Sequence, residues 1–188
     1  MKRKLINRSA FIGSLIWASL CLTSCEKHDG VGYYYSKCEA DLNGQYLIDQ
    51  SRFDWGLGVG KSPHIIASEC EIDFESKLST ERGGFPLYYV YIDMFVEKPW
   101  AFLTEPQIIR YVQPDDAEEV QTPWDYTRYC DYKKINYAKI FISTTSETEI
   151  VKEGSFKITE YDKEKSTYKG NFELQFSEGT LKGDFTIY

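Results

Sequence analysis

The C-terminal stretch of the chain alternates between apolar and polar residues, and this pattern limits what the chain can fold into. Three runs show it, Gly154–Tyr161, Thr167–Phe176 and Thr180–Ile187, with short polar turns between them. Successive side chains of a strand point to opposite faces of a sheet, so a period of two predicts strands with one buried face. We expect a three-stranded antiparallel meander here. Its core face should carry six apolar residues: Phe172, Leu174, Phe176, Leu181, Phe185 and Ile187.

Strands are also predicted before this meander. Asn43-Gly44 separates two strand-like runs, and the dipeptide indicates a hairpin because both residues accept positive φ. Residues 66–75 alternate along a single predicted strand, with Cys70 as a buried thiol. Residues 86–97 are apolar on both faces and predict a central strand.

Two further strands complete the predicted fold. Residues 136–144 predict one, and Gln107–Val112 predicts a short one within a long Pro-rich connection. No amphipathic helix of ten or more residues stands out. Many short strands with turn signals between them predict an all-β fold, either an antiparallel β-sandwich or a small barrel.

The first 24 residues have the pattern of a cleaved secretory signal peptide. Four basic residues begin it, and the apolar segment Ala10–Leu22 is too short to span a bilayer. The segment ends in Leu22-Thr23-Ser24-Cys25, which resembles a bacterial lipobox. The resemblance implies that the Cys25 thiol is lipidated and that the chain is cut just before it. Residues 25–32 then form a predicted tether, and residues 33–188 a single β-domain.

The charge of the chain bears on its partners. The 188 residues have a formal net charge of −7, and loss of residues 1–24, which carry four basic and no acidic residues, lowers it to −11. An acidic body is repelled by anionic surfaces, so lipid on Cys25 should hold it at the membrane. The same balance argues against nucleic acid as a partner, because phosphate binding needs a basic face.

Three cysteines remain after Cys25 in the mature chain: Cys38, Cys70 and Cys130. An exported chain permits disulfides, and an odd number of thiols allows at most one intramolecular bond. The sequence does not choose the pair.

Metal-binding patterns are sparse. The mature chain has only His28 and His64 and no CxxC, so we expect no zinc site and no cofactor. An acidic run could bind Ca²⁺, but it lacks the EF-hand spacing and is better interpreted as a solvated loop. Its members are Asp115, Asp116, Glu118 and Glu119.

Three features together resemble small lipoproteins of the Bacteroidetes. They are the lipobox, the strand–Asn-Gly–strand segment from Asp41 to Ile48, and a closing GxF…F…GxF hairpin built on Gly170, Phe172, Phe176, Gly183 and Phe185. The resemblance implies an outer-membrane location and a β-rich domain without an established activity, so no catalytic residue is carried over. It leaves open whether the domain faces the periplasm or the cell surface.

The connection over residues 98–130 is the candidate ligand site. Long connections are usually functional or disordered, and a segment this rich in aromatic residues should be ordered and form a wall of the main cleft. Trp124 and Tyr126 are predicted to contact a glycan, because the apolar face of a sugar stacks on flat rings. Asp125 and Arg128 are predicted as its polar partners. The alternative is that these rings cap the core.

We therefore expect a non-catalytic binding or structural module of the cell envelope, with a glycan or a protein as ligand. The alternative is a hydrolase acting on glycans or peptides, which would show two carboxylates about 5–10 Å apart in a cleft. No GxSxG motif is present, and His64 is interpreted as an ordinary edge residue. A third possibility is an assembly subunit with an unpaired edge strand that accepts a partner strand.

Overall fold

The computed structural model describes residues 36–51, 62–68, 70–95, 106–115 and 120–188. The predictions for the signal peptide, for Cys25 and for the tether lie outside these described residues.

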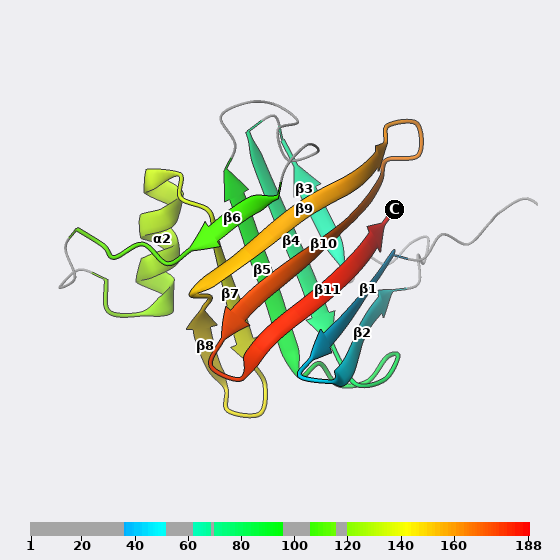
Figure 1. Cartoon of the computed structure of the whole chain (residues 1–188), viewed down its shortest axis with the longest axis horizontal. Coiled ribbons are helices and arrows are strands. Elements are labelled where there is room, and N and C mark those ends of the chain that lie inside the picture. The colour runs from blue at the N-terminus through cyan, green and yellow to red at the C-terminus, as the bar shows by residue number, and fades with distance from the viewer. Residues whose placement is uncertain (1–35, 52–61, 69, 96–105, 116–119) are drawn as a thin grey trace, which may run out of the picture. The chain divides into compact units, whose positions relative to one another are not determined.

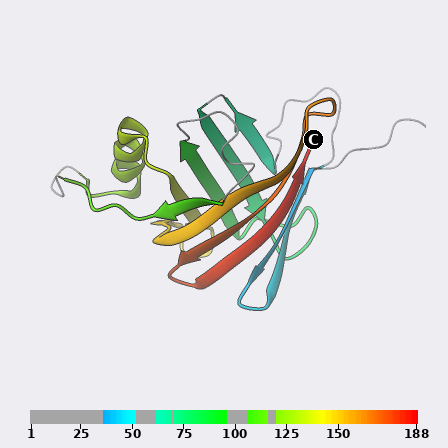
Figure 2. The same cartoon turned by 45° about the horizontal axis from the view of Figure 1, so that its top comes forward.

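Two antiparallel sheets form the fold (Figures 1 and 2). The first has the strand order β2-β1-β11-β10-β9-β6, and the second has the order β3-β4-β5-β7-β8. The strands of the first sheet are β1 (Ser36–Leu42), β2 (Gln45–Ser51), β6 (Gln107–Arg110), β9 (Glu153–Asp162), β10 (Thr167–Phe176) and β11 (Gly179–Ile187). The other elements are β3 (His64–Ala67), β4 (Glu71–Leu78), β5 (Tyr88–Phe95), β7 (Tyr137–Ile142), β8 (Glu147–Ile150) and the helix α2 (Pro123–Lys133).

The core lies between the two sheets. The ring of Phe74 on β4 lies 5.7 Å from Phe156, 5.5 Å from Phe172 and 4.9 Å from Phe185, measured between ring centroids. All four rings are buried, and the last three belong to the first sheet. Because both sheets end in edge strands, the described strands form a sandwich and not a closed barrel. The all-β prediction is confirmed, and the structure decides between its two forms.

The C-terminal meander is confirmed. β10 pairs with β9 on one side and with β11 on the other, and all six predicted core residues are at most 5% exposed. β11 then pairs with β1, so the two ends of the domain are neighbours in one sheet.

The Asn43-Gly44 hairpin is also confirmed. These residues join β1 to β2 with φ of 53° and 88°, the left-handed region that this dipeptide favours. The Asn43 side chain donates to the backbone carbonyl of Glu178 at 2.6 Å, which ties this turn to the β10–β11 turn.

The prediction of one strand over residues 66–75 is wrong. The segment divides into the end of β3 and the start of β4, and the backbone N–H of Ser68 donates to the Glu71 carbonyl at 2.8 Å in the turn between them. Cys70 lies in this turn and is exposed, not buried. The alternation misled because the turn contains no Gly or Pro to interrupt it.

The central strand is confirmed, since β5 lies between β4 and β7 in the middle of its sheet. Residues 136–144 contain β7, and Gln107–Val112 contains β6. None of the three described cysteines is in a disulfide: Cys38 and Cys130 are buried free thiols.

The helix α2 was not predicted. Thr122 caps its N-terminus, Pro123 stands in its first turn, and Lys134 ends it in the left-handed conformation. Tyr126 and Cys130 on its buried side pack with Tyr137 of β7 in a second small core. The helix therefore covers the part of the outer face of the second sheet at Tyr137.

Candidate functional site

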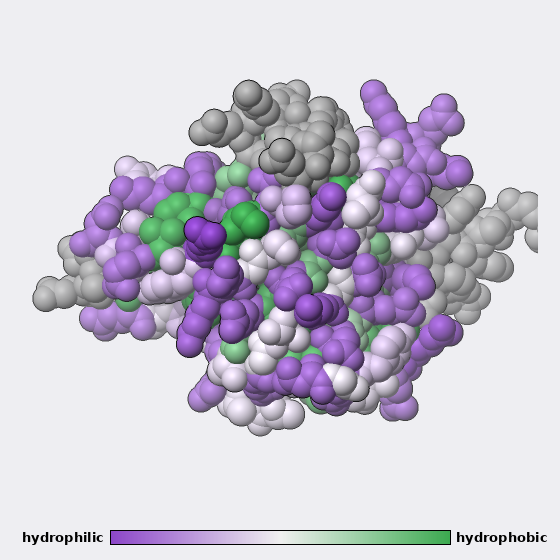
Figure 3. All heavy atoms as spheres, in the orientation of Figure 1, coloured by the Kyte–Doolittle hydropathy of each residue, from purple (hydrophilic) through white to green (hydrophobic). Residues whose placement is uncertain are grey.

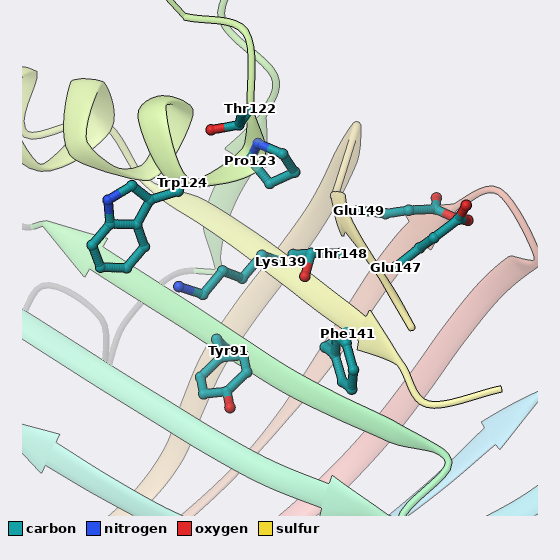
Figure 4. Close-up of a pocket in the computed structure, with 9 residues that line it drawn as sticks. All are labelled: Tyr91, Thr122, Pro123, Trp124, Lys139, Phe141, Glu147, Thr148 and Glu149. Atoms are coloured by element: carbon teal, nitrogen blue, oxygen red, sulfur yellow. The ribbon is translucent and has the colours of Figure 1, made fainter. Parts of the chain in front are cut away.

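A groove of about 720 Å³ lies between the start of α2 and the outer face of the second sheet (Figure 4). Its lining comes from the helix start and from β5, β7 and β8. The lining residues are Tyr91, Thr122, Pro123, Trp124, Lys139, Phe141, Glu147, Thr148 and Glu149.

The strand register builds the floor of this groove. Tyr91 pairs with Lys139, and Phe141 pairs with Thr148, across neighbouring strands. The residues that alternate with them, such as Ile92 and Ile140, are fully buried. Since side chains alternate between faces, Tyr91, Lys139 and Phe141 point away from the core and into the groove.

The helix N-terminus supplies the wall. The Thr122 side chain accepts from the Asp125 backbone N–H at 3.2 Å, and the Asp125 carboxylate accepts from the Thr122 backbone N–H at 3.1 Å. These reciprocal bonds form a capping box. The bond from the Thr122 hydroxyl contributes most to lowering the pKa of Asp125. The cap places Trp124 over the groove, where 65% of its surface is exposed.

An ammonium group lies among the groove rings. Lys139 Nζ is 5.1 Å from the ring centroid of Tyr91 and 5.9 Å from that of Trp124. These distances suit cation–π contacts, which hold the charge near both ring faces. Glu147 and Glu149 of β8 line the opposite end of the groove, and their side chains point away from Lys139 and Phe141 (Figure 4). Glu149 accepts from the backbone N–H of Ser177 at 3.1 Å and also from its hydroxyl.

Only one of the four predicted ligand residues lines the groove. Trp124 does, whereas Tyr126 is 2% exposed, stacks on Tyr111 at 4.7 Å, and accepts from the Val112 backbone N–H at 2.9 Å. Burial raises the pKa of Tyr126. For Tyr126 the structure therefore gives the alternative role of a core ring.

Helix geometry explains why Trp124 lines the groove while Tyr126 is buried. Residues two apart on an α-helix point to different sides, while residues two apart on a strand point to the same side. Asp125 has its carboxylate in the capping box, and Arg128 is exposed and outside the groove lining. Tyr91, Lys139 and Phe141 were not predicted as site residues, although their outward positions follow from the alternation within residues 86–97 and 136–144.

A pair of carboxyl groups lies on the same sheet face, outside the groove lining. Asp73 and Asp93 are directly opposite each other on β4 and β5. Desolvation raises the pKa of Asp93 to about 7, a hydrogen bond with Tyr137 opposes this rise, and a hydrogen bond with Asp73 adds to it. The two carboxyl groups therefore contact each other directly, closer than the separation expected for a glycosidase pair.

The remaining candidates are placed as follows. His64 begins the edge strand β3, with its Nε2 3.8 Å from Glu75 Oε2. Asp115 lies 3.5 Å from Lys133 Nζ, and the other members of the acidic run lie outside the described residues. Within the described ranges, no group of three or more His, Cys, Asp or Glu side chains is arranged to hold a metal.

A second hollow of about 380 Å³ lies by β6, lined by Ile108, Arg110, Val112, Ile135 and Asn136. Figure 3 shows apolar residues gathered at β6, beside the hydrophilic outer face of β9–β11. The Asn136 side chain donates to the Ile108 carbonyl at 3.3 Å, which occupies a backbone group on this edge of the sheet. The larger groove combines rings, a cation and carboxylates, and it is the stronger candidate.

Comparison of the chain with protein-family models, with curated proteins and with solved structures gives no match. No helix in the described part of the chain is long and apolar enough to cross a membrane. Any assignment of function therefore rests on the groove and on the N-terminal motif.

Proposed function

We propose that this chain is a non-catalytic glycan-binding protein of the cell envelope, held at the outer membrane by lipid on Cys25. The groove of α2, β5, β7 and β8 is the binding site. The lipobox Leu22-Thr23-Ser24-Cys25 and the acidic net charge support the anchor, because charge alone would not hold this body at an anionic membrane.

One observation carries the glycan assignment. Trp124 is 65% exposed at the wall of a groove whose floor includes Tyr91 and Phe141. A tryptophan usually buries most of its large surface, so a mostly exposed one beside other rings is available to a ligand. Sugar rings present flat C–H faces that pack on such surfaces.

Polar groups complete the site. Lys139 can donate to a sugar oxygen, and Thr148 can donate or accept. A few polar groups placed among apolar rings are typical of small-ligand sites, in which the rings supply area and the polar groups fix orientation.

The test compares two exposed aromatic residues on one helix. Trp124→Ala removes the groove wall, and Tyr132→Ala removes a ring that is 83% exposed and lies outside the groove lining. The protein purified from membranes in detergent is applied to a glycan array, and the melting temperature of each variant is measured. We expect Trp124→Ala to lose the glycans that the wild type binds, with Tyr132→Ala and both melting temperatures little changed.

Two outcomes would contradict the proposal. The first is a wild-type protein that binds no glycan on an array that includes bacterial and plant polysaccharides. The second is equal glycan binding by Trp124→Ala and wild type. A large fall in melting temperature for Trp124→Ala would instead make this ring part of the core.

A further inference from the structure

The position of Lys139 narrows the chemistry of the ligand. Among the residues that the structure describes, Lys139 is the only basic one that lines the groove. The described residues contain seven ion pairs, and none of them involves Lys139, so no described carboxylate lies within 4.0 Å of its ammonium. This is notable in a chain with 29 acidic and 22 basic residues.

Two rings hold this charge in the groove. Lys139 Nζ lies 5.1 Å from the ring centroid of Tyr91 and 5.9 Å from that of Trp124, so the ammonium is beside both rings. Ring contacts of this kind attract the charge but accept no ordinary hydrogen bond from it, so its N–H donors remain available to a ligand. An anionic oxygen bound there would lie next to the same rings that stack on the sugar.

The two ends of the groove differ in charge. Lys139 reaches the end with Trp124 and Tyr91, while Glu147 and Glu149 lie at the other end (Figure 4). Glu149 is already bonded to Ser177. A second anionic group would be repelled at the glutamate end.

We infer that the groove binds acidic saccharides, with the carboxylate of a uronic acid at Lys139 Nζ and an uncharged part of the saccharide at Phe141 and Thr148. This inference rests on the proposed glycan-binding function and specifies its ligand class. The charge-assisted bond to the carboxylate supplies the selectivity, and the rings supply contact area that acidic and neutral sugars share.

The experiment uses two ligands that differ in the charge of the carboxyl group and in the methyl group that removes it. Oligogalacturonate and its fully methyl-esterified form have the same sugar skeleton, and their binding to the detergent-purified protein is measured by calorimetry. We expect the wild type to prefer the acid about tenfold or more, as a charge-assisted hydrogen bond implies. The preference should fall as salt rises, because an open groove is screened.

Lysine variants test whether Lys139 causes the preference for the acid over the ester. Lys139→Gln should bind both forms equally, with affinity for the ester kept, while Lys139→Arg should keep the preference. Lys77→Gln is the matched control. Lys77 lies on the outward face of β4 in the same sheet, 3.4 Å from Glu75, and is not in the groove lining. It should leave the preference unchanged.

The outcomes separate this inference from the proposed function. Equal binding of acid and ester by the wild type, or a preference that survives in Lys139→Gln, would overturn the acidic ligand while glycan binding stands. A polyglutamate peptide that binds as tightly as the acid would show recognition of charge alone and would also overturn it. Should Lys139→Gln fail to fold, the wild-type comparison and its salt dependence still decide. No glycan binding by the wild type would reject both proposals.

Discussion

The substitution Gly183→Ala tests the packing of the C-terminal meander. The β10–β11 register places Phe172 directly opposite Gly183, and Phe185 opposite Gly170. A Cβ on Gly183 would lie 2.6 Å from Cε1 and 2.9 Å from Cε2 of Phe172, and closer still to Cζ. The ring therefore lies across the glycine, which explains why each GxF unit pairs with the phenylalanine of the other.

The loss of stability in Gly183→Ala depends on how firmly the Phe172 ring is held. Phe172 is 2% exposed, and its ring lies 5.5 Å from that of Phe74 in the opposite sheet. It cannot move toward solvent, so a new methyl group must displace packed rings or the strand backbone. Overpacking of this kind costs about 1–3 kcal/mol. For a domain of this size, that is a fall in melting temperature of about 3–10 °C.

The assay is thermal and urea unfolding followed by circular dichroism, for Gly183→Ala in the wild-type background and in a Phe172→Leu background. Leucine lacks the distal ring atoms that meet the new Cβ. The cost of Gly183→Ala should therefore shrink in the Phe172→Leu background, giving a coupling energy of about 1 kcal/mol or more. An equal cost in both backgrounds, or no cost in either, would refute the idea that the ring occupies the space beside the glycine.

Three other predictions concern a carboxyl pair, a buried hydroxyl and the anchor. Burial first, and then the hydrogen bond from Asp73, raise the pKa of Asp93 from 3.8 to about 7, so the folded state holds this proton more tightly than the unfolded state. Its contribution to stability is therefore present below about pH 4 and lost as the pH rises to about 7. Asp93→Asn mimics the protonated form, so its melting temperature should match wild type near pH 4 and exceed it at pH 8. An equal difference at both pH values would contradict this. Tyr126→Phe removes the hydroxyl that accepts from Val112 N–H at 2.9 Å and should lower the unfolding free energy by about 0.5–1.5 kcal/mol; an unchanged urea midpoint would argue against this bond. Cys25→Ala should release the protein from membranes, and a variant that still sediments with salt-washed membranes would exclude the lipid anchor.

Local patterns predicted much of the fold, for identifiable reasons. The period-two alternation located β10 and β11, because each has one face against the core and one toward solvent. Asn43-Gly44 located the first hairpin, because its positive φ values are a local property of that dipeptide. The pattern failed between Ala67 and Glu71, where one strand ends and the next begins without a glycine or proline in the sequence.

The helix shows a different limit. Its capping box, Thr122 to Asp125, and its first-turn proline are local signals that the sequence contains. As residues of the connection 98–130, Trp124 and Tyr126 were both predicted to contact the ligand. On the helix they separate, because a rotation of about 100° per residue sends one ring to the groove and the other to the core.

By itself, the sequence located most of the strands, showed which of their side chains share a face, and showed where the N-terminal motif lies. Only the tertiary structure decided which faces meet. The groove residues come from three elements: Tyr91 from β5, Trp124 from α2, and Lys139 and Phe141 from β7. Strand order, register and the position of α2 bring them together. Alternation shows that a side chain points outward, but whether that outward face is covered or open depends on contacts between residues far apart in the chain.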